Sequence, residues 1–226
     1  MKAITSEEII ESITDSLQYI SYYHPPDYIK NLALAYELEE SKPAKDAMAQ
    51  ILINSRMCAE GKRPICQDTG IVTIFCRVGM NAKWSFDQPL GVLINEGVRQ
   101  AYLHPDNKLR ASVLAEPAGA RRNTEDNTPA VIHFDMVSGN QLEFIIAAKG
   151  GGSENKSKFA MLNPSDDIID WVLKTVPTMG AGWCPPGMLG IGIGGTAEKA
   201  MLMAKESLMD PIDMQELIGR GANTAI

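Results

Sequence analysis

Hydrophobic residues recur at helical spacing through the first sixty positions. Thr5 and Glu8 form a capping box, and isoleucine or leucine then returns every three or four residues until the prolines at 25 and 26. Similar patterns predict helices over residues 28–38 and 43–60. No residue type in this stretch points to chemistry, so we expect an N-terminal helical segment.

The pattern then changes to runs of β-branched and aromatic residues, which favour strands over residues 71–78, 131–137 and 142–148. The Ser-Gly-Asn sequence at 138–140 predicts a turn that joins the last two strands as a hairpin. Three apolar-periodic segments fit helices packed on the sheet, at residues 90–103, 166–176 and 197–208.

Strands and helices mix in this chain without a strict alternating repeat. We therefore predict an α+β fold, in which the N-terminal helical segment is followed by a mixed sheet with packed helices. No repeat, low-complexity run or linker marks a boundary, so residues 1–226 are interpreted as one catalytic domain.

Composition narrows the class of protein. The net charge is −7, and the 21 basic residues are scattered, so nucleic acid is not expected as a partner. No segment at the N-terminus resembles a signal peptide, and no segment reaches the ~18 apolar residues of a membrane span. We therefore expect a cytoplasmic protein. Its four cysteines do not suggest a disulfide framework, so a cysteine with a special role is expected to be a ligand or a catalytic group.

The first candidate site is the loop before the first strand, where Cys66, Gln67 and Asp68 are adjacent. A cysteine there can bind a metal while its neighbours offer a hydrogen-bonding amide and a proton-transfer carboxylate. A buried cysteine followed by a turn that Asp68 caps is the alternative.

A second candidate is Cys184, which two prolines follow and glycines flank. Proline cannot continue a helix, so the backbone turns away from the preceding element and leaves the sulfur accessible. A tight turn with an incidental cysteine explains the same pattern.

A third candidate is the run of Lys149, Gly150, Gly151 and Gly152, which follows a strand. Successive backbone amides of such a run can converge on an anion, and Lys149 adds positive charge. We interpret it as a carboxylate-binding nest, with a flexible surface loop as the alternative.

The glycines at 190–195 match the dinucleotide-binding pattern G-x-G-x-x-G. That function requires a following parallel strand with an acidic residue for the ribose, and the chain after Asp210 shows only a short helix-like pattern. We therefore favour close backbone packing, with an anion at the start of the next helix as a further option.

Taken in order, the motifs at residues 65–70, 148–153 and 182–187 resemble class I fumarate hydratase and the related tartrate dehydratase alpha subunits. The resemblance extends across the chain and includes residues 122–124 and 126–130. It implies a lyase, specifically a hydro-lyase, that reversibly hydrates fumarate to L-malate, a reaction of the tricarboxylic acid cycle.

The resemblance also implies a 4Fe-4S cluster held by three cysteines, whose remaining iron binds the substrate as a Lewis acid. Cys66 and Cys184 match two ligands, and Gln67 and Asp68 match substrate-contacting positions, Asp68 also as the catalytic group. Arg110 matches a carboxylate-binding arginine. Lys149 and the glycines at 150, 151 and 152 would line the same pocket.

The family's third cysteine, its catalytic histidine and a second domain have no counterpart in these 226 residues. Cys58 falls in a predicted helix and Cys76 in a predicted strand, so we interpret these two as structural. His24, His104 and His133 are interpreted as surface or packing residues. We therefore expect a chain truncated at its C-terminus, which supplies part of the site and needs the missing region or a partner subunit.

Three functions remain open at this stage. The chain is part of a fumarate hydratase, homodimeric as in the full-length family, or a tartrate dehydratase alpha-type subunit with a small dicarboxylate as its substrate. Alternatively, it is an inactive binding or assembly module, because two thiolates cannot supply three ligands. A mononuclear site with two cysteines is the weakest option, since two further ligands at recognised spacing are absent from the sequence.

Overall fold

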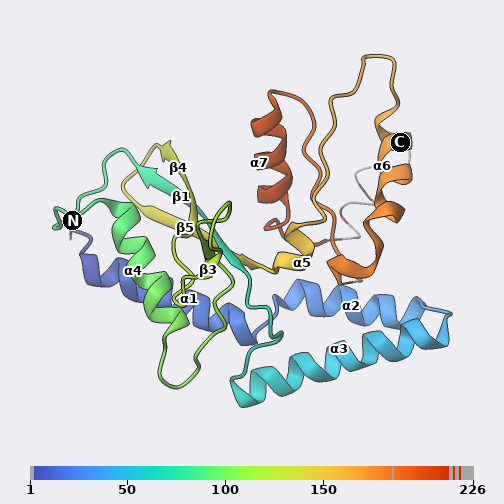
Figure 1. Ribbon diagram of the computed structural model, residues 1–226, viewed down its shortest axis with the longest axis horizontal. Helices are drawn as coiled ribbons and strands as arrows, with labels where there is room; N and C mark the ends of the chain where they lie inside the picture. The colour runs from blue at the N-terminus through green and yellow to red at the C-terminus, as the bar shows by residue number, and fades with distance from the viewer. Residues whose placement is uncertain (1–2, 185, 214–215, 217–218, 220–226) are drawn as a thin grey trace. The chain divides into compact units, whose positions relative to one another are not determined.

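A computed structural model describes residues 3–184, 186–213, 216 and 219 (Figure 1). The chain forms two compact units, each of which is described by itself. The first contains residues 1–24 and 53–151, and the second contains residues 25–52 and 152–226. Within the described ranges, no helix is both long and apolar enough to cross a membrane.

The first unit combines a three-stranded sheet with two long helices and the end of a third. Its elements are α1 (Ser6–Tyr22), the last part of α3 (Lys42–Gly61), β1 (Ile71–Gly79), α4 (Leu90–Tyr102), β2 (Leu114–Ala115), β3 (Arg122–Asn123), β4 (Val131–Val137) and β5 (Leu142–Lys149). The strands β2 and β3 form a separate antiparallel pair. The predicted α+β class, with a helical segment before a mixed sheet, is confirmed.

Local sequence explains where α1 begins. The Thr5 hydroxyl accepts a hydrogen bond from the backbone N–H of Glu8 at 3.1 Å, and the Glu8 carboxylate accepts one from the backbone N–H of Thr5 at 2.9 Å. The predicted capping box is therefore present, and it satisfies two backbone N–H groups that would otherwise lack partners at the start of the helix.

The order of the sheet is β4-β1-β5, with β4 parallel and β5 antiparallel to β1. The predicted hairpin between the last two strands is wrong, because β1 lies between them. The connecting turn passes the end of β1, where the Gly79 N–H donates to the carbonyl of Gln141 and the Asn81 N–H donates to that of Gly139, each at 2.8 Å. The strongly apolar β1 is more buried than either edge strand, which explains its central position.

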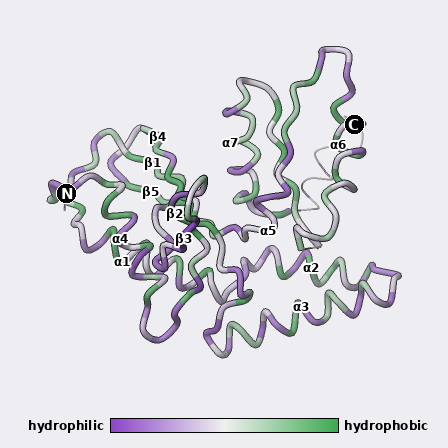
Figure 2. The backbone as a smooth tube through the Cα atoms, in the orientation of Figure 1, coloured by the Kyte–Doolittle hydropathy of each residue, from purple (hydrophilic) through white to green (hydrophobic). Residues whose placement is uncertain are grey.

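The core of the first unit lies between the sheet and the helices α1 and α4. Alternate residues of β1, which share one face of the strand, pack there against apolar residues of both helices. Figure 2 shows hydrophobic and hydrophilic residues alternating along α1 and α4, as expected for helices with one buried side. The fully buried members of this core are Ile9, Ile13, Leu17, Val72, Ile74, Cys76, Ile94, Val98, Ala101 and Tyr102.

The second unit is helical in its described residues. It contains α2 (Pro26–Leu38), the first part of α3, most of α5 (Gly151–Glu154), α6 (Ile168–Thr175), the 3₁₀ segment η1 (Val176–Trp183) and α7 (Ala197–Ser207). The helices predicted at 166–176 and 197–208 are present, but they belong to this unit and not to the unit that contains the sheet.

Polar contacts tie distant segments of the second unit together. In α2, the Nδ2 of Asn31 donates to the backbone carbonyl of Ile212 at 3.0 Å. The Oδ2 of Asp27 accepts from the backbone N–H of Ile212 at 2.7 Å. Lys205 of α7 forms an ion pair with Glu154 of α5. Among the described residues of this unit, Leu32 is the buried apolar side chain.

Candidate active site

The loop that carries Cys66, Gln67 and Asp68 connects α3 to β1 in the first unit. Cys66 and Gln67 are exposed, whereas Asp68 is half-buried. The Sγ atom of Cys66 accepts a hydrogen bond from the backbone N–H of Asp68 at 3.4 Å, and the Cys66 thiol lies 3.5 Å from Oε1 of Gln67. The sulfur of Cys66 is therefore exposed and oriented by contacts within the loop.

The Asp68 carboxylate is held by three donors of its own chain. Its Oδ1 accepts from the backbone N–H of Gly70 at 3.2 Å and from the Ser112 hydroxyl at 3.3 Å, and its Oδ2 accepts from the backbone N–H of Gly151 at 2.8 Å. A carboxylate offers about four acceptor positions, so one position on Oδ2 remains for a proton or a substrate donor.

The glycine at position 70 is required by the geometry of this loop. Its φ angle is +84°, and a Cβ atom would lie 2.6–2.8 Å from backbone atoms of Ala148 and Lys149 at the end of β5. The loop can therefore approach the end of β5 only if this position has no side chain.

Buried polar groups also bind the backbone of the loop that contains Asp68. The Tyr102 hydroxyl, at the end of α4, donates to the carbonyl of Thr69 at 2.8 Å. Burial raises the pKa of Tyr102, so the hydroxyl remains a donor at physiological pH. Asn127 is fully buried, and its Nδ2 donates to the carbonyl of Gly70 at 3.0 Å.

Asn127 also connects the loop to the segment that carries Ser112. Its Oδ1 accepts from the backbone N–H groups of Ser112 at 2.7 Å and Val113 at 3.1 Å. Its backbone has a φ of +62°, a left-handed conformation that asparagine tolerates better than most residues. One buried amide thus positions both the turn after Asp68 and the serine that bonds to Asp68.

Arg110, which the sequence predicts to bind a carboxylate, lies next to this network. Its backbone carbonyl accepts a hydrogen bond from the Thr69 hydroxyl, and its side chain is exposed. The flanking residues Leu109 and Ala111 are buried, which anchors the backbone while the guanidinium faces solvent. The structure therefore brings Arg110 to the loop that contains Asp68.

The glycine run begins where β5 ends. Lys149, the last residue of β5, pairs with Ile71 of β1 and is half-buried. The Gly151 amide, predicted to bind a substrate carboxylate, binds the carboxylate of Asp68. A Cβ at Gly150 would lie 3.2 Å from Asp68 Oδ2, so the absence of a side chain there permits this close approach.

Gly152 and Cys184 belong to the second unit. A Cβ at Gly152 would lie 2.9 Å from the carbonyl oxygen of Gly182, so the third glycine packs against the segment just before the cysteine. Cys184 is exposed, and its φ of +61° places a non-glycine residue in the left-handed region. Strain of this kind costs of order 1–3 kcal/mol and is concentrated at functional sites.

The two other cysteines are buried in regular structure, as predicted. Cys58 lies in α3 with 6% of its surface exposed, and Cys76 lies in β1 with 1% exposed. Burial raises the pKa of the Cys76 thiol to about 11, which disfavours the thiolate needed for ligation. The structure therefore leaves Cys66 and Cys184 as the accessible thiols.

An exposed thiol is the type of ligand that an iron-sulfur cluster requires. Each unit contributes one exposed thiol, and no group of three or more His, Cys, Asp or Glu side chains in the described residues is placed to hold a single metal ion. The chain thus offers two accessible thiols, one fewer than the resemblance requires.

The remaining sequence candidates have structural roles. The histidines contact neighbours: His24 bonds to Ser55, His133 stacks on Phe75, and His104 accepts from the N–H of Asp106. In the glycine run at 190–195, Cβ atoms at Gly190 and Gly192 would lie 2.1 Å and 1.9 Å from carbonyl oxygens of α7. The predicted close backbone packing is confirmed.

Tyr102 and Ser112 lie outside the motifs listed for the resemblance, and Asn127 lies in its segment 126–130, to which the sequence assigned no role. Asn127 stands in an Asp-Asn-Thr-Pro segment, whose composition is typical of a turn, and an asparagine there is compatible with a left-handed conformation. Nothing in the sequence indicates that Ser112 contacts a residue more than forty positions earlier.

Known proteins resemble this chain over most of its length. A profile of the family described as Fumarate hydratase (Fumerase) matches residues 10–223. A putative L(+)-tartrate dehydratase subunit alpha from Methanocaldococcus jannaschii is 34% identical over 211 residues, which cover 91% of this chain and 73% of that protein.

Two proteins from Escherichia coli are also similar. The L(+)-tartrate dehydratase subunit alpha of strain O157:H7 is 23% identical over 91% of this chain and 68% of its own length. The class I anaerobic fumarate hydratase of strain K12 is 32% identical over 75% of this chain but only 31% of its own length.

The comparisons therefore define the class of this chain as a hydro-lyase subunit of the fumarate hydratase and tartrate dehydratase type. The chain belongs to the fumarate hydratase family, within the group formed by class I fumarate hydratases and tartrate dehydratase alpha subunits. It spans part of the length of a full class I fumarate hydratase.

Proposed function

We propose that this chain is the alpha-type subunit of a hydro-lyase that removes water from a small hydroxy dicarboxylate, with L(+)-tartrate as the first candidate substrate. The observation that carries the proposal is the fixed Asp68 carboxylate beside the exposed thiol of Cys66. The relatives that match most of this chain are named tartrate dehydratase alpha subunits, which favours tartrate over fumarate.

Removal of water from a hydroxy acid breaks a carbon–oxygen bond and takes a proton from the adjacent carbon. Asp68 is the proposed proton-transfer group, because one acceptor position on its Oδ2 remains open while three donors fix its orientation. Ser112 and Gly151 hold the carboxylate in one geometry, so little reorganisation accompanies the transfer.

Arg110, Lys149 and Gln67 are proposed to bind the substrate. A guanidinium can hold a carboxylate through two parallel hydrogen bonds, and Arg110 is exposed beside the loop of Asp68. Lys149 would contribute a second positive charge, and the Gln67 amide a hydrogen-bonding group. The pocket is proposed to be shaped by Gly150, Gly151 and Gly152, which have no side chains and therefore leave space for neighbouring groups to approach closely.

Cys66 and Cys184 are the proposed ligands of a 4Fe-4S cluster. When bound, the cluster supplies a Lewis acid that polarises the leaving hydroxyl. The role of this chain's residues is to present thiolates, and the exposure of Cys66 and Cys184 supports that role. Cys58 and Cys76 are buried and are not proposed as ligands.

A partner is proposed to supply the remaining ligand. The relatives named subunit alpha imply a companion subunit, and this chain offers two accessible thiols. We therefore propose a beta-type subunit as partner. The match to a class I fumarate hydratase keeps fumarate hydration to malate as the second candidate activity.

The test is anaerobic iron and sulfide reconstitution of the chain with and without its partner subunit. Assays should follow oxaloacetate formation from L(+)-tartrate and the interconversion of fumarate and L-malate. Iron binding and turnover that require both chains would support the proposal. A stable complex with the partner that shows neither iron nor turnover would instead indicate an assembly module.

A further inference from the structure

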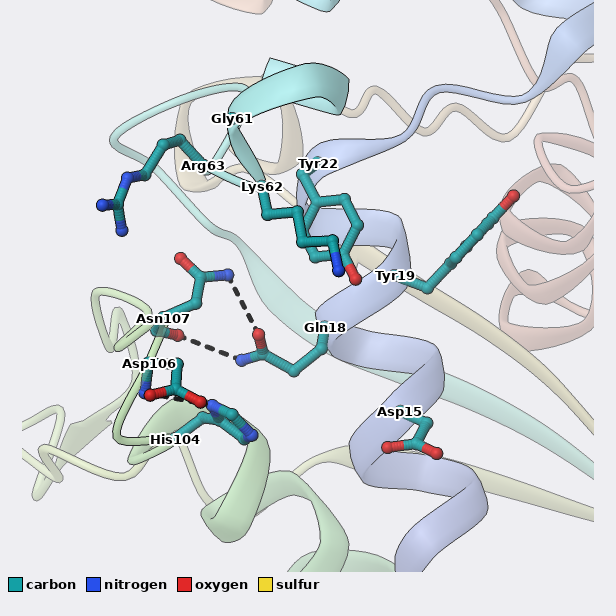
Figure 3. Close-up of a pocket in the computed structure, with 10 residues that line it drawn as sticks. All are labelled: Asp15, Gln18, Tyr19, Tyr22, Gly61, Lys62, Arg63, His104, Asp106 and Asn107. Atoms are coloured by element: carbon teal, nitrogen blue, oxygen red, sulfur yellow. Dashed lines mark hydrogen bonds between the residues drawn. The ribbon is translucent and has the colours of Figure 1, made fainter. Parts of the chain in front are cut away.

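A cavity of about 550 Å³ lies in the first unit, apart from the candidate active site (Figure 3). It is formed by the last turns of α1, the end of α3 and the segment after α4. None of the proposed catalytic or ligand-binding residues lines it. Its volume lies within the usual range for small-molecule sites.

The floor of the cavity is a pair of buried amides. Gln18 and Asn107 are each 8% exposed, and the Nδ2 of Asn107 donates to the Oε1 of Gln18 at 2.9 Å. In Figure 3 the side-chain oxygen of Asn107 points away from Gln18, toward the side of Arg63. This oxygen has no hydrogen-bond partner among the described residues, so an accessible acceptor on a largely buried side chain faces the cavity without a donor.

The charges around the cavity are separated by sign. Lys62 and Arg63 extend from the end of α3, and Asp15 and Asp106 lie on the opposite side of the Gln18–Asn107 pair in Figure 3. Among the described residues, none of these four side chains forms an ion pair, and their formal charges sum to zero. The cavity is thus neutral overall but positive at one end and negative at the other.

We propose that this cavity binds a free α-amino acid. The carboxylate would bind between Lys62 and Arg63, and the adjacent ammonium would donate to the unpartnered Oδ1 of Asn107. The two aspartates at the far end favour a ligand with a positive group. Tyr19 and Tyr22 also line the cavity, which suits an apolar or aromatic side chain.

The same arrangement disfavours the dicarboxylates of the proposed reaction. A second carboxylate on the ligand would face Asp15 or Asp106, and like charges repel. An α-hydroxy monocarboxylate could still donate to Asn107, but it would lack the positive charge that the aspartates attract. The site is therefore distinct in ligand chemistry from the candidate active site.

The experiment measures binding to the full chain by isothermal titration, with L-phenylalanine as the probe. L-phenyllactate replaces the ammonium by a hydroxyl, 3-phenylpropanoate removes the donor, and L-malate adds the second carboxylate. We expect L-phenylalanine to bind most tightly, L-phenyllactate more weakly, and the other two not measurably.

Arg63→Gln and Lys62→Gln are each expected to raise the dissociation constant of L-phenylalanine about tenfold, the usual effect of losing one charged hydrogen bond. Lys108→Gln, which changes an exposed lysine outside the cavity, is the matched control and should leave binding unchanged. Thermal unfolding of each variant checks that the fold is intact.

Binding of L-malate in preference to L-phenylalanine, or amino-acid binding that Arg63→Gln and Lys62→Gln leave unchanged, would overturn the proposal. Absence of binding by all four compounds to the intact wild-type chain would do the same. Iron binding and turnover are measured separately, so failure here is distinguishable from failure of the proposed hydro-lyase activity.

Discussion

The carboxylate of Asp68 accepts a hydrogen bond of 2.8 Å from the backbone N–H of Gly151, although 83 positions separate the two residues. This contact joins the cysteine loop to the glycine run, two of the three motifs on which the family resemblance depends. The glycine run therefore binds a carboxylate of its own chain, because its Gly151 amide orients Asp68, the group proposed to transfer the proton.

Asp68→Asn is expected to lower turnover by at least about a hundredfold, because proton transfer by a positioned carboxylate contributes roughly that much or more. The amide also presents donors where Asp68 now accepts three hydrogen bonds, so unfolding should become easier by about 1–3 kcal/mol. Steady-state assays and urea unfolding measure the two effects. Asp87→Asn, which changes an exposed aspartate outside both the candidate active site and the proposed amino-acid cavity, is the control. Wild-type turnover in Asp68→Asn would contradict the assigned role.

Gly70→Ala is expected to destabilise the chain by about 2 kcal/mol or more, because both its φ and its close neighbours exclude a side chain. Gly139→Ala provides a matched comparison, since Gly139 has a φ of +109° but a Cβ there would meet no atom within 4 Å. Urea unfolding should therefore show the larger loss at position 70. Equal losses would mean that φ alone, and not the contact with β5, determines the requirement.

Asn127→Ala removes an amide with three hydrogen bonds from a fully buried position. We expect a loss of about 2–4 kcal/mol in the free energy of unfolding, since the backbone groups left behind remain buried and unpaired. Asn123→Ala, which changes an exposed residue, should cost less. If the two variants unfold at the same urea concentration, Asn127 does not organise the loop.

Iodoacetamide should label Cys66 and Cys184 in the native chain at pH 8 and leave Cys58 and Cys76 unmodified. The first two thiols are exposed, and burial raises the pKa of Cys76 to about 11, so that residue stays protonated at this pH. Peptide mass spectrometry identifies the labelled sites. Rapid native labelling of Cys76 would show that β1 is more accessible than the structure indicates.

The raised pKa of Cys76 also predicts a dependence of stability on pH. Between about pH 9 and 11 the unfolded chain releases this proton while the folded chain retains it, so folding stability falls as the pH rises through this window. Cys76→Ala should flatten this decline, as measured by urea unfolding at several pH values. If the free energy of unfolding falls with pH at the same slope in Cys76→Ala, other titrating groups cause the decline.

The sequence predicts the elements of this fold better than their pairing. The capping box at Thr5 and the apolar run of β1 are local signals, and the structure contains both features. The turn at 138–140 is present too, but local sequence cannot show that β1 lies between the strands that it connects. Strand order depends on which strand is most completely buried, a property of the whole core.

The residues of the candidate site also differ in how well the sequence predicts them. Cys66 and Asp68 are adjacent in a recognisable motif, so the sequence identifies them directly. Ser112 and Asn127 act through contacts with residues far away in the chain, and their types are common in ordinary turns. Only the folded chain shows that they hold the carboxylate.

The most direct test of the proposed cluster site is the iron content of the complex of this chain with its partner subunit, reconstituted anaerobically, in wild type and in Cys66→Ser. We predict about four irons per complex and tartrate turnover in wild type, with both strongly reduced in Cys66→Ser. Cys58→Ser is the control and should keep both. Full iron content and turnover in Cys66→Ser would contradict the assignment of this thiol as a cluster ligand and, with it, the proposed site.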